Sequence, residues 1–143
     1  MRIFNRRASH DYELQEHFEA GINLLGAEVK AVRLGRADLT GAHVRIVGHE
    51  AYLVNASIFP YEYARPEQYD ERRTRKLLLH KSQILNFRHK MDGANLTLVP
   101  ISVYTTGSLI KLEIALGKGK KQYQKKEAKK KRDLKRELER QDL

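Results

Sequence analysis

Apolar and polar residues alternate along several short segments of the chain, and this pattern predicts β-strands. From Tyr12 to Ile22 the apolar side chains fall mainly on one face and the charged and amide side chains on the other. Such alternation is typical of a strand with one buried face. Residues 96–104 and 109–116 are β-rich runs joined by a glycine-containing turn, and they predict a hairpin. Residues 44–58 predict a second hairpin, because a turn containing a glycine interrupts their apolar positions.

Apolar positions spaced three or four residues apart predict two short helices. Residues 25–32 follow this spacing before Gly35, which can take the left-handed conformation that ends a helix. The same spacing recurs from Ser82, a candidate N-cap, to Gly93. Residues 60–75 are rich in Pro, Tyr and charge and have no sustained period, so we expect a long loop there.

These elements predict a mainly β fold, an OB-like antiparallel β-barrel with two or three short helices. A sandwich with decorating helices is the alternative. We divide the chain into an OB-like barrel over residues 1–116 and a basic tail over residues 117–143. The tail has too few apolar residues to fold alone, so we expect it to be disordered until bound. Its composition favours a helix once a partner neutralises its charge.

The positive charge of the chain is concentrated in this tail. The chain has 28 Lys and Arg against 18 Asp and Glu, a net charge of +10, and the tail alone holds 12 against 5. An excess of this size favours a polyanionic partner such as nucleic acid. The sequence has no cysteine, which excludes disulfides and thiolate metal sites, and no apolar run long enough to span a membrane. These features fit a cytoplasmic protein that is neither secreted nor membrane-bound.

The tail is a candidate RNA-contacting segment. The run from Gly117 to Lys121 places three cations on a flexible backbone that can follow phosphates closely, and Tyr123 can stack on a base. A solvated linker is the alternative, but the cations continue along the tail, which favours contact with RNA. The candidate residues are Lys118, Gly119, Lys120 and Lys121, followed by Tyr123, Lys125, Lys126, Lys130, Lys131, Arg132, Lys135 and Arg136.

Two basic clusters lie in the body of the chain, one at the start of the first strand and one around the first predicted helix. Solvated surface charge is the alternative for both. Glu28, within that helix, can accept hydrogen bonds from basic side chains or from nucleotide amino groups, and a simple exposed acid is its alternative. The clusters are Arg6, Arg7, His10 and Tyr12, and Lys30, Arg33 and Arg36.

Sequence patterns that would indicate catalysis or metal binding are missing. The chain has no Walker A spacing, and its six histidines show no paired-ligand spacing, so we expect no metal and no cofactor. Ser9, His10 and Asp11 cannot form a catalytic relay, because adjacent strand residues point to opposite faces. An RNA-processing enzyme is the alternative from another class, and it would need clustered carboxylates or a nucleophile with its base. We therefore expect no enzymatic activity.

Six segments of the chain resemble signature segments of the SsrA-binding protein (SmpB) family. They occur in the order found in that family and together cover nearly the whole chain. Several independent motifs at the right spacing make the resemblance specific. The segments are Asn5–Tyr12, Phe18–Ile22, Gly26–Lys30, Arg75–Lys81, Leu96–Pro100 and Gly117–Lys121.

This resemblance implies a monomeric barrel that binds the transfer-RNA-like domain of transfer-messenger RNA (SsrA RNA) and brings it to stalled ribosomes. It implies that the tail folds as a helix in the vacant messenger channel and signals to the decoding centre. By position, Asn5, Glu28, Lys76 and nearby basic residues would form the RNA-binding face. The chain departs from the family at Gln124 and Lys126, where an acid and an arginine are usual. A general ribosomal or initiation-type OB protein is the alternative in the same class.

Overall fold

A computed structural model describes residues 1–120 and 122–141 of the chain, and their fold is mainly β, as predicted. The strands are β1 (Arg2–Phe4), β2 (Tyr12–Ile22), β3 (Ala37–Asp38), β4 (His43–Val47), β5 (Glu50–Val54), β6 (Ser57–Ile58), β7 (Arg75–Leu78), β8 (Thr97–Thr106) and β9 (Leu109–Gly119). The helices are α1 (Ala8–Asp11), α2 (Gly26–Arg33), α3 (Lys81–Ala94) and α4 (Gln122–Gln141), and a 3₁₀ turn, η1, covers Glu62–Ala64.

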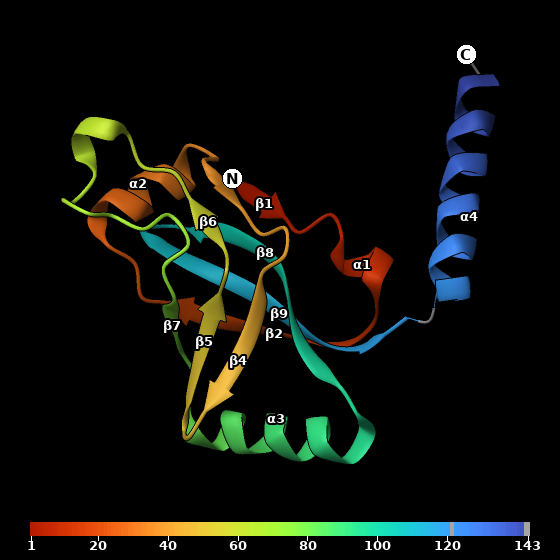
Figure 1. The fold of residues 1–143 in the computed structure, drawn as a ribbon, viewed down its shortest axis with the longest axis horizontal. Coiled ribbons are helices and arrows are strands. Elements are labelled where there is room, and N and C mark those ends of the chain that lie inside the picture. Colours follow the sequence, from red (N-terminus) through yellow and green to blue (C-terminus); the bar gives the residue numbers. More distant parts are fainter. Residues whose placement is uncertain (121, 142–143) are drawn as a thin grey trace.

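The large sheet has seven strands in the order β1-β8-β9-β2-β7-β5-β4, and its neighbouring strands are antiparallel. β3 and β6 form a separate two-stranded sheet. β4, at one edge of the large sheet, also lies against β8 near the other edge, so the sheet curls into a barrel (Figure 1). The OB-like antiparallel barrel predicted from the sequence is therefore confirmed, and the sandwich alternative is not adopted.

The barrel core forms where the alternating faces of the long strands turn inward. Leu112 and Ile114 of β9 stand opposite Ala20 and Phe18 of β2, and both β9 side chains are fully buried. Burying one such aliphatic side chain contributes about 1.5–3 kcal/mol. α3 covers one end of the barrel with Phe87, whose ring centroid lies 4.7 Å from that of Phe18. These contacts fix the register of β2 against β9 and therefore the position of both strand ends.

The two predicted body helices are confirmed, with ends set by backbone geometry. α2 ends shortly before Gly35, whose φ of +75° is the left-handed conformation expected there. The N-cap of α3 is His80, two residues before the predicted Ser82, because the His80 N–H donates to the Gln83 side-chain oxygen at 3.0 Å. The helix ends at Asn95, which takes the left-handed conformation in place of a glycine.

The barrel strand β9 continues beyond the predicted boundary at Leu116. It runs to Gly119, because its backbone pairs with β2 and places Gly119 opposite Tyr12. α4 then extends away from the barrel strands, close to α1 (Figure 1), and its described side chains, at 126 and 129–139, are all exposed. The expectation that this helix forms only on a partner stays a prediction. No helix within residues 1–120 and 122–141 is long and apolar enough to cross a membrane.

Candidate nucleic-acid interface

The corner formed by β1, α1 and the start of β2 carries the first predicted basic cluster, and Asn5 holds this corner in place. The Asn5 side-chain amide donates to the Pro100 carbonyl at 2.9 Å, and its backbone N–H donates to the Ile101 carbonyl at 2.7 Å. Its side-chain oxygen accepts a hydrogen bond from the Arg7 N–H at 3.3 Å. Asn5 therefore fixes the chain that presents Arg6 and Arg7.

A surface hollow of about 420 Å³ lies beneath this corner. Arg7 stands at the hollow with its side chain 61% exposed, 3.5 Å from the Asp11 carboxylate. His10 Nδ1 lies 2.8 Å from the same carboxylate, because these residues belong to the helix α1 and not to a strand, as the sequence analysis assumed. The exposed imidazole of His43 also lines the hollow, although its position in the sequence gave no sign of this. The lining residues are Asn5, Arg7, Ala8, Asp11, Tyr12, Thr40, Gly41, Ala42, His43, Leu98, Val99 and Pro100.

A second hollow, of about 460 Å³, adjoins the first and shares Thr40 with it. Arg6 and Arg2 line it, together with Gly35 just after α2. The Arg2 guanidinium stacks 4.0 Å from the ring centroid of Tyr104 and donates to the Ser102 hydroxyl at 3.0 Å. Exposed cationic side chains therefore line both hollows, which is the arrangement that binding of a phosphate backbone requires.

The root of the tail joins this same corner. Lys120 donates its backbone N–H to the Asp11 carbonyl at 2.9 Å and its ammonium group to the Ser9 carbonyl at 2.8 Å, so it caps the carbonyl end of α1. Lys118 is exposed and stands opposite Glu13. The structure thus brings the first basic cluster and the described part of the predicted Gly117–Lys121 run together. Lys121 itself lies outside the described residues.

The second basic cluster, on α2 and just after it, borders the second hollow. Lys30 and Arg33 are exposed, and Arg33 donates to the Ser108 carbonyl at 3.1 Å in the turn between β8 and β9. The Arg36 guanidinium lies 4.2 Å from the ring centroid of Tyr61. Gly35 and Ala37, the sequence neighbours of Arg36, line the second hollow together with Arg6 of the first cluster, so the two predicted clusters occupy neighbouring parts of one surface.

The structure excludes the alternative that Glu28 is a simple exposed acid on its helix. It is fully buried, and its carboxylate accepts hydrogen bonds from the Leu25 N–H at 2.8 Å and the Tyr69 hydroxyl at 2.9 Å. The Arg73 guanidinium and the Arg75 guanidinium, at 2.6 Å, complete the site. The hydrogen bonds from basic side chains that the sequence predicted for Glu28 are therefore present, whereas the enclosed carboxylate is not exposed to nucleotide amino groups. Its place in the fold is structural, tying α2 to the start of β7.

The pKa of Glu28 follows from this enclosure. Burial alone raises the pKa of the carboxyl group, but hydrogen bonds from Arg73, the Leu25 N–H, Arg75 and Tyr69 outweigh it, and the pKa falls below its ordinary value. Burial, reinforced by the hydrogen bond to Glu28, raises the pKa of Tyr69 to about 12. The carboxylate is therefore ionised and the phenol neutral at physiological pH.

Lys76 does not join the α1 corner. Its ammonium group lies 3.2 Å from the Glu50 carboxylate on the neighbouring strand β5, and both side chains are about half exposed. β7, which carries Lys76, is separated from β1 in the sheet by β2, β9 and β8. The structure therefore places Lys76 on another part of the barrel surface from the basic corner. The pairing of Lys76 with Glu50 depends on which strands are neighbours in the sheet, and the local sequence does not encode this strand order.

The tail presents its cations along α4. The side chains described there are exposed, and Leu134 and Leu138 are the large apolar residues among them. The side chains of Tyr123 and Lys125 lie outside the described part of the chain. Within residues 1–120 and 122–141, no group of three His, Asp or Glu is placed to hold a metal ion. The exposed cations are Lys126, Lys130, Lys131, Arg132, Lys135 and Arg136.

Comparisons with known proteins identify the family of this chain. The family model for the SmpB protein matches residues 2–142. An SsrA-binding protein of Persephonella marina is 48% identical over 94% of this chain and 88% of its own length, and one of Microcystis aeruginosa is 45% identical over 97% and 88%. A chain of the solved structure "tmRNA-SmpB: a journey to the center of the bacterial ribosome" matches with a TM-score of 0.69 and 44% identity, covering 85% of each chain. This chain belongs to the SmpB family of SsrA-binding proteins.

Proposed function

We propose that this protein is an RNA-binding adaptor that binds the transfer-RNA-like domain of transfer-messenger RNA and delivers it to stalled ribosomes. The observation that carries the proposal is the near full-length match to SsrA-binding proteins and to a chain from a tmRNA–SmpB ribosome structure. The protein would supply binding and positioning, while peptide transfer would remain the work of the ribosome. Its site of action would be the cytoplasm, where ribosomes translate.

The proposed RNA-binding face is the α1 corner with its two hollows and the end of α2. Exposed cations there can neutralise phosphates without first breaking a buried ion pair, so binding costs little protein rearrangement. Folded RNA presents phosphates and 2′-hydroxyl groups over a broad surface, which suits recognition by shape. Asn5 would act by holding the corner, and Glu28 by holding α2. The residues that would contact RNA are Arg6, Arg7, His10, Tyr12, Lys30, Arg33, Arg36, Lys118, Gly119 and Lys120.

The proposed ribosome-binding part is α4. A helix of 20 residues is roughly 30 Å long, enough to reach well beyond the barrel. Its exposed cations suit a channel lined by ribosomal RNA, and Leu134 and Leu138, one helical turn apart, give it one small apolar contact. The proposal is that this helix enters the empty messenger channel and contacts the decoding centre.

Binding to a transfer-messenger RNA transcript tests the RNA-binding half of the proposal. Full-length protein and a variant ending at Lys120 are compared across a salt series with bulk transfer RNA as competitor. This end point keeps all of β9 and the Lys120 cap on α1, which truncation at Leu116 would remove. We expect the shortened protein to keep tight binding that transfer RNA does not compete away.

The salt dependence separates the barrel from the tail. If the tail neutralises about six phosphates, its removal makes the slope of log affinity against log salt shallower by about 4 to 5. If it is reserved for the ribosome, the two slopes agree. Loss of binding on truncation, or equal competition by bulk transfer RNA, would contradict the proposed function and favour a nonspecific basic-tail protein.

A further inference from the structure

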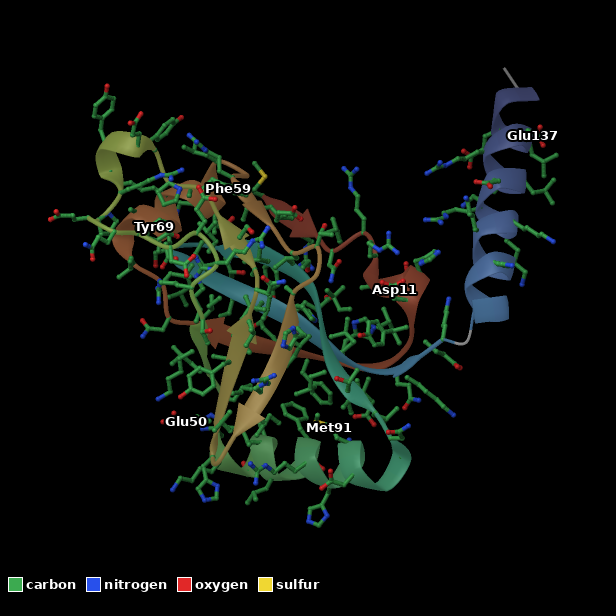
Figure 2. The ribbon with its side chains drawn as sticks, in the orientation of Figure 1. Asp11, Glu50, Phe59, Tyr69, Met91 and Glu137 are labelled. Atoms are coloured by element: carbon green, nitrogen blue, oxygen red, sulfur yellow. The ribbon has the colours of Figure 1, made fainter. Side chains whose placement is uncertain are left out.

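The loop between β6 and β7, residues 59–74, projects from the barrel beside α2 and is held by buried contacts at its base (Figure 1). Tyr69 and Arg73 of this loop both bond to the buried Glu28 carboxylate. Figure 2 labels Tyr69 and Phe59, which both belong to this loop. Buried Arg75 adds a hydrogen bond to the Glu71 carbonyl at 3.0 Å. The base of the loop is therefore anchored to the protein interior.

The middle of the loop is also fixed, by contacts within it. The Arg65 side chain donates to the Pro60 carbonyl at 2.9 Å and pairs with the Glu71 carboxylate at 3.0 Å. These contacts close the chain around η1 and hold its turn in one orientation. An ordered projection loses little conformational entropy when it binds a partner, so its tip is suited to recognition.

Two tyrosines occupy the tip of this loop. Tyr61 is 57% exposed and lies under the Arg36 guanidinium, whereas Tyr63, in η1, is 100% exposed. An aromatic ring exposed to this extent gives no stability to the folded protein, yet the loop around it is held in place. A free aromatic face is the group that stacks on an unpaired nucleobase.

The charges around the tip favour nucleic acid as the partner. Lys30, Arg33 and Arg36 lie on the α2 side of the loop. The Phe59 N–H donates a hydrogen bond to the Arg36 carbonyl at 2.9 Å, which ties the start of the loop to this side. The exposed acids Glu62, Glu67 and Asp70 lie in the loop itself. A phosphate backbone would therefore run along α2, and only a base would reach the tip.

We propose that Tyr63 stacks on an unpaired base of the bound RNA while α2 holds the adjacent phosphates. The inference rests on the proposed RNA-binding function and adds a site of base stacking to it. Stacking recognises an unpaired base without reading its identity, because every base has an aromatic face. The contact would distinguish an RNA with a base turned outward at this place from a regular duplex.

A tryptophan at position 63 tests the contact directly, because the protein has no natural tryptophan. In full-length Tyr63→Trp protein, we expect titration with a transfer-messenger RNA transcript to quench the indole fluorescence. The matched control is Leu85→Trp at an exposed site on α3, at the opposite end of the barrel from the loop (Figure 1), and we expect no quenching there. Equal signals at the two positions would overturn the inference. A signal from Tyr63→Trp that depends on protein concentration alone would identify a second copy of the chain as the partner and would also overturn it.

Affinities of two further variants complete the test. Tyr63→Ala should weaken binding to the transcript by about tenfold or more, while Tyr63→Phe, which keeps the ring, should bind as the natural protein does. Because the side chain is fully exposed, both variants should melt at the natural temperature. Absence of binding by the natural protein would overturn the proposed function and this inference together. Tight natural binding that Tyr63→Ala retains would overturn the stacking contact alone.

Discussion

The Glu28 carboxylate joins α2 to a distant stretch of the chain, the end of the loop before β7 and the first residue of β7. It bonds to Arg73 and Arg75, which lie 45 and 47 positions later in the sequence, and to Tyr69. Arg75 is itself fully buried, so each charge depends on the other for compensation. The sequence identified Glu28 as unusual but could not predict these partners, because their proximity arises from the pairing of β7 with β2 and β5.

Replacing Glu28 with glutamine should lower the free energy of unfolding by about 3 kcal/mol at pH 7, because it leaves a buried guanidinium without its anion. The folded-state pKa of Glu28 lies below its ordinary value of 4.5, so the ionised carboxylate stabilises the fold above pH 4.5, and this stabilisation is lost as the pH falls through the folded pKa. Urea unfolding of the natural and Glu28→Gln proteins from pH 3 to pH 7 measures this contribution to the free energy of unfolding.

The difference in stability between natural and Glu28→Gln protein should therefore shrink as the pH falls below 4.5. Glu67→Gln is the matched control, because Glu67 is an exposed acid in the same loop, and we expect it to change stability by less than about 0.5 kcal/mol at any pH. A Glu28→Gln deficit that is independent of pH would show that lost packing, and not lost charge, destabilises the variant.

At the scale of elements, β2, β8 and β9 approach one another closely where the tail leaves the barrel. A Cβ built at Gly117 of β9 would lie 3.2 Å from both Tyr12 Cβ and Val99 Cγ2. The alternation of apolar and polar residues predicted these strands well, because it shows directly which residues face the core. It could not predict the close approach or the length of β9 to Gly119, because both depend on neighbouring strands.

Substitution of Gly117 by valine should destabilise the barrel by about 1–3 kcal/mol, because its side chain has to displace two packed neighbours. Gly119→Val is a control on the same strand, since a Cβ at Gly119 meets nothing within 4 Å. Thermal unfolding followed by circular dichroism compares the two. Equal melting temperatures for the variants would be inconsistent with the packing described at the end of β9.

At the scale of the whole molecule, one corner carries both the proposed RNA-binding residues and the exit of the tail. Lys120 bonds to the carbonyls of Ser9 and Asp11 in α1, the helix that contains His10 and directly follows Arg7. An RNA bound at this corner would therefore lie next to the base of α4. Composition alone predicted a basic tail on a mildly basic body, but only the folded chain shows that the tail begins at the basic corner.

The most direct test of the proposed adaptor role is peptide tagging on ribosomes stalled on a message without a stop codon, in a reconstituted translation system. We expect transfer-messenger RNA to add its tag with full-length protein, and the variant ending at Lys120 to bind this RNA but to support little or no tagging. Tagging by the shortened protein at the full-length rate would contradict the role given to α4, and absence of tagging with the full-length protein would contradict the adaptor function itself.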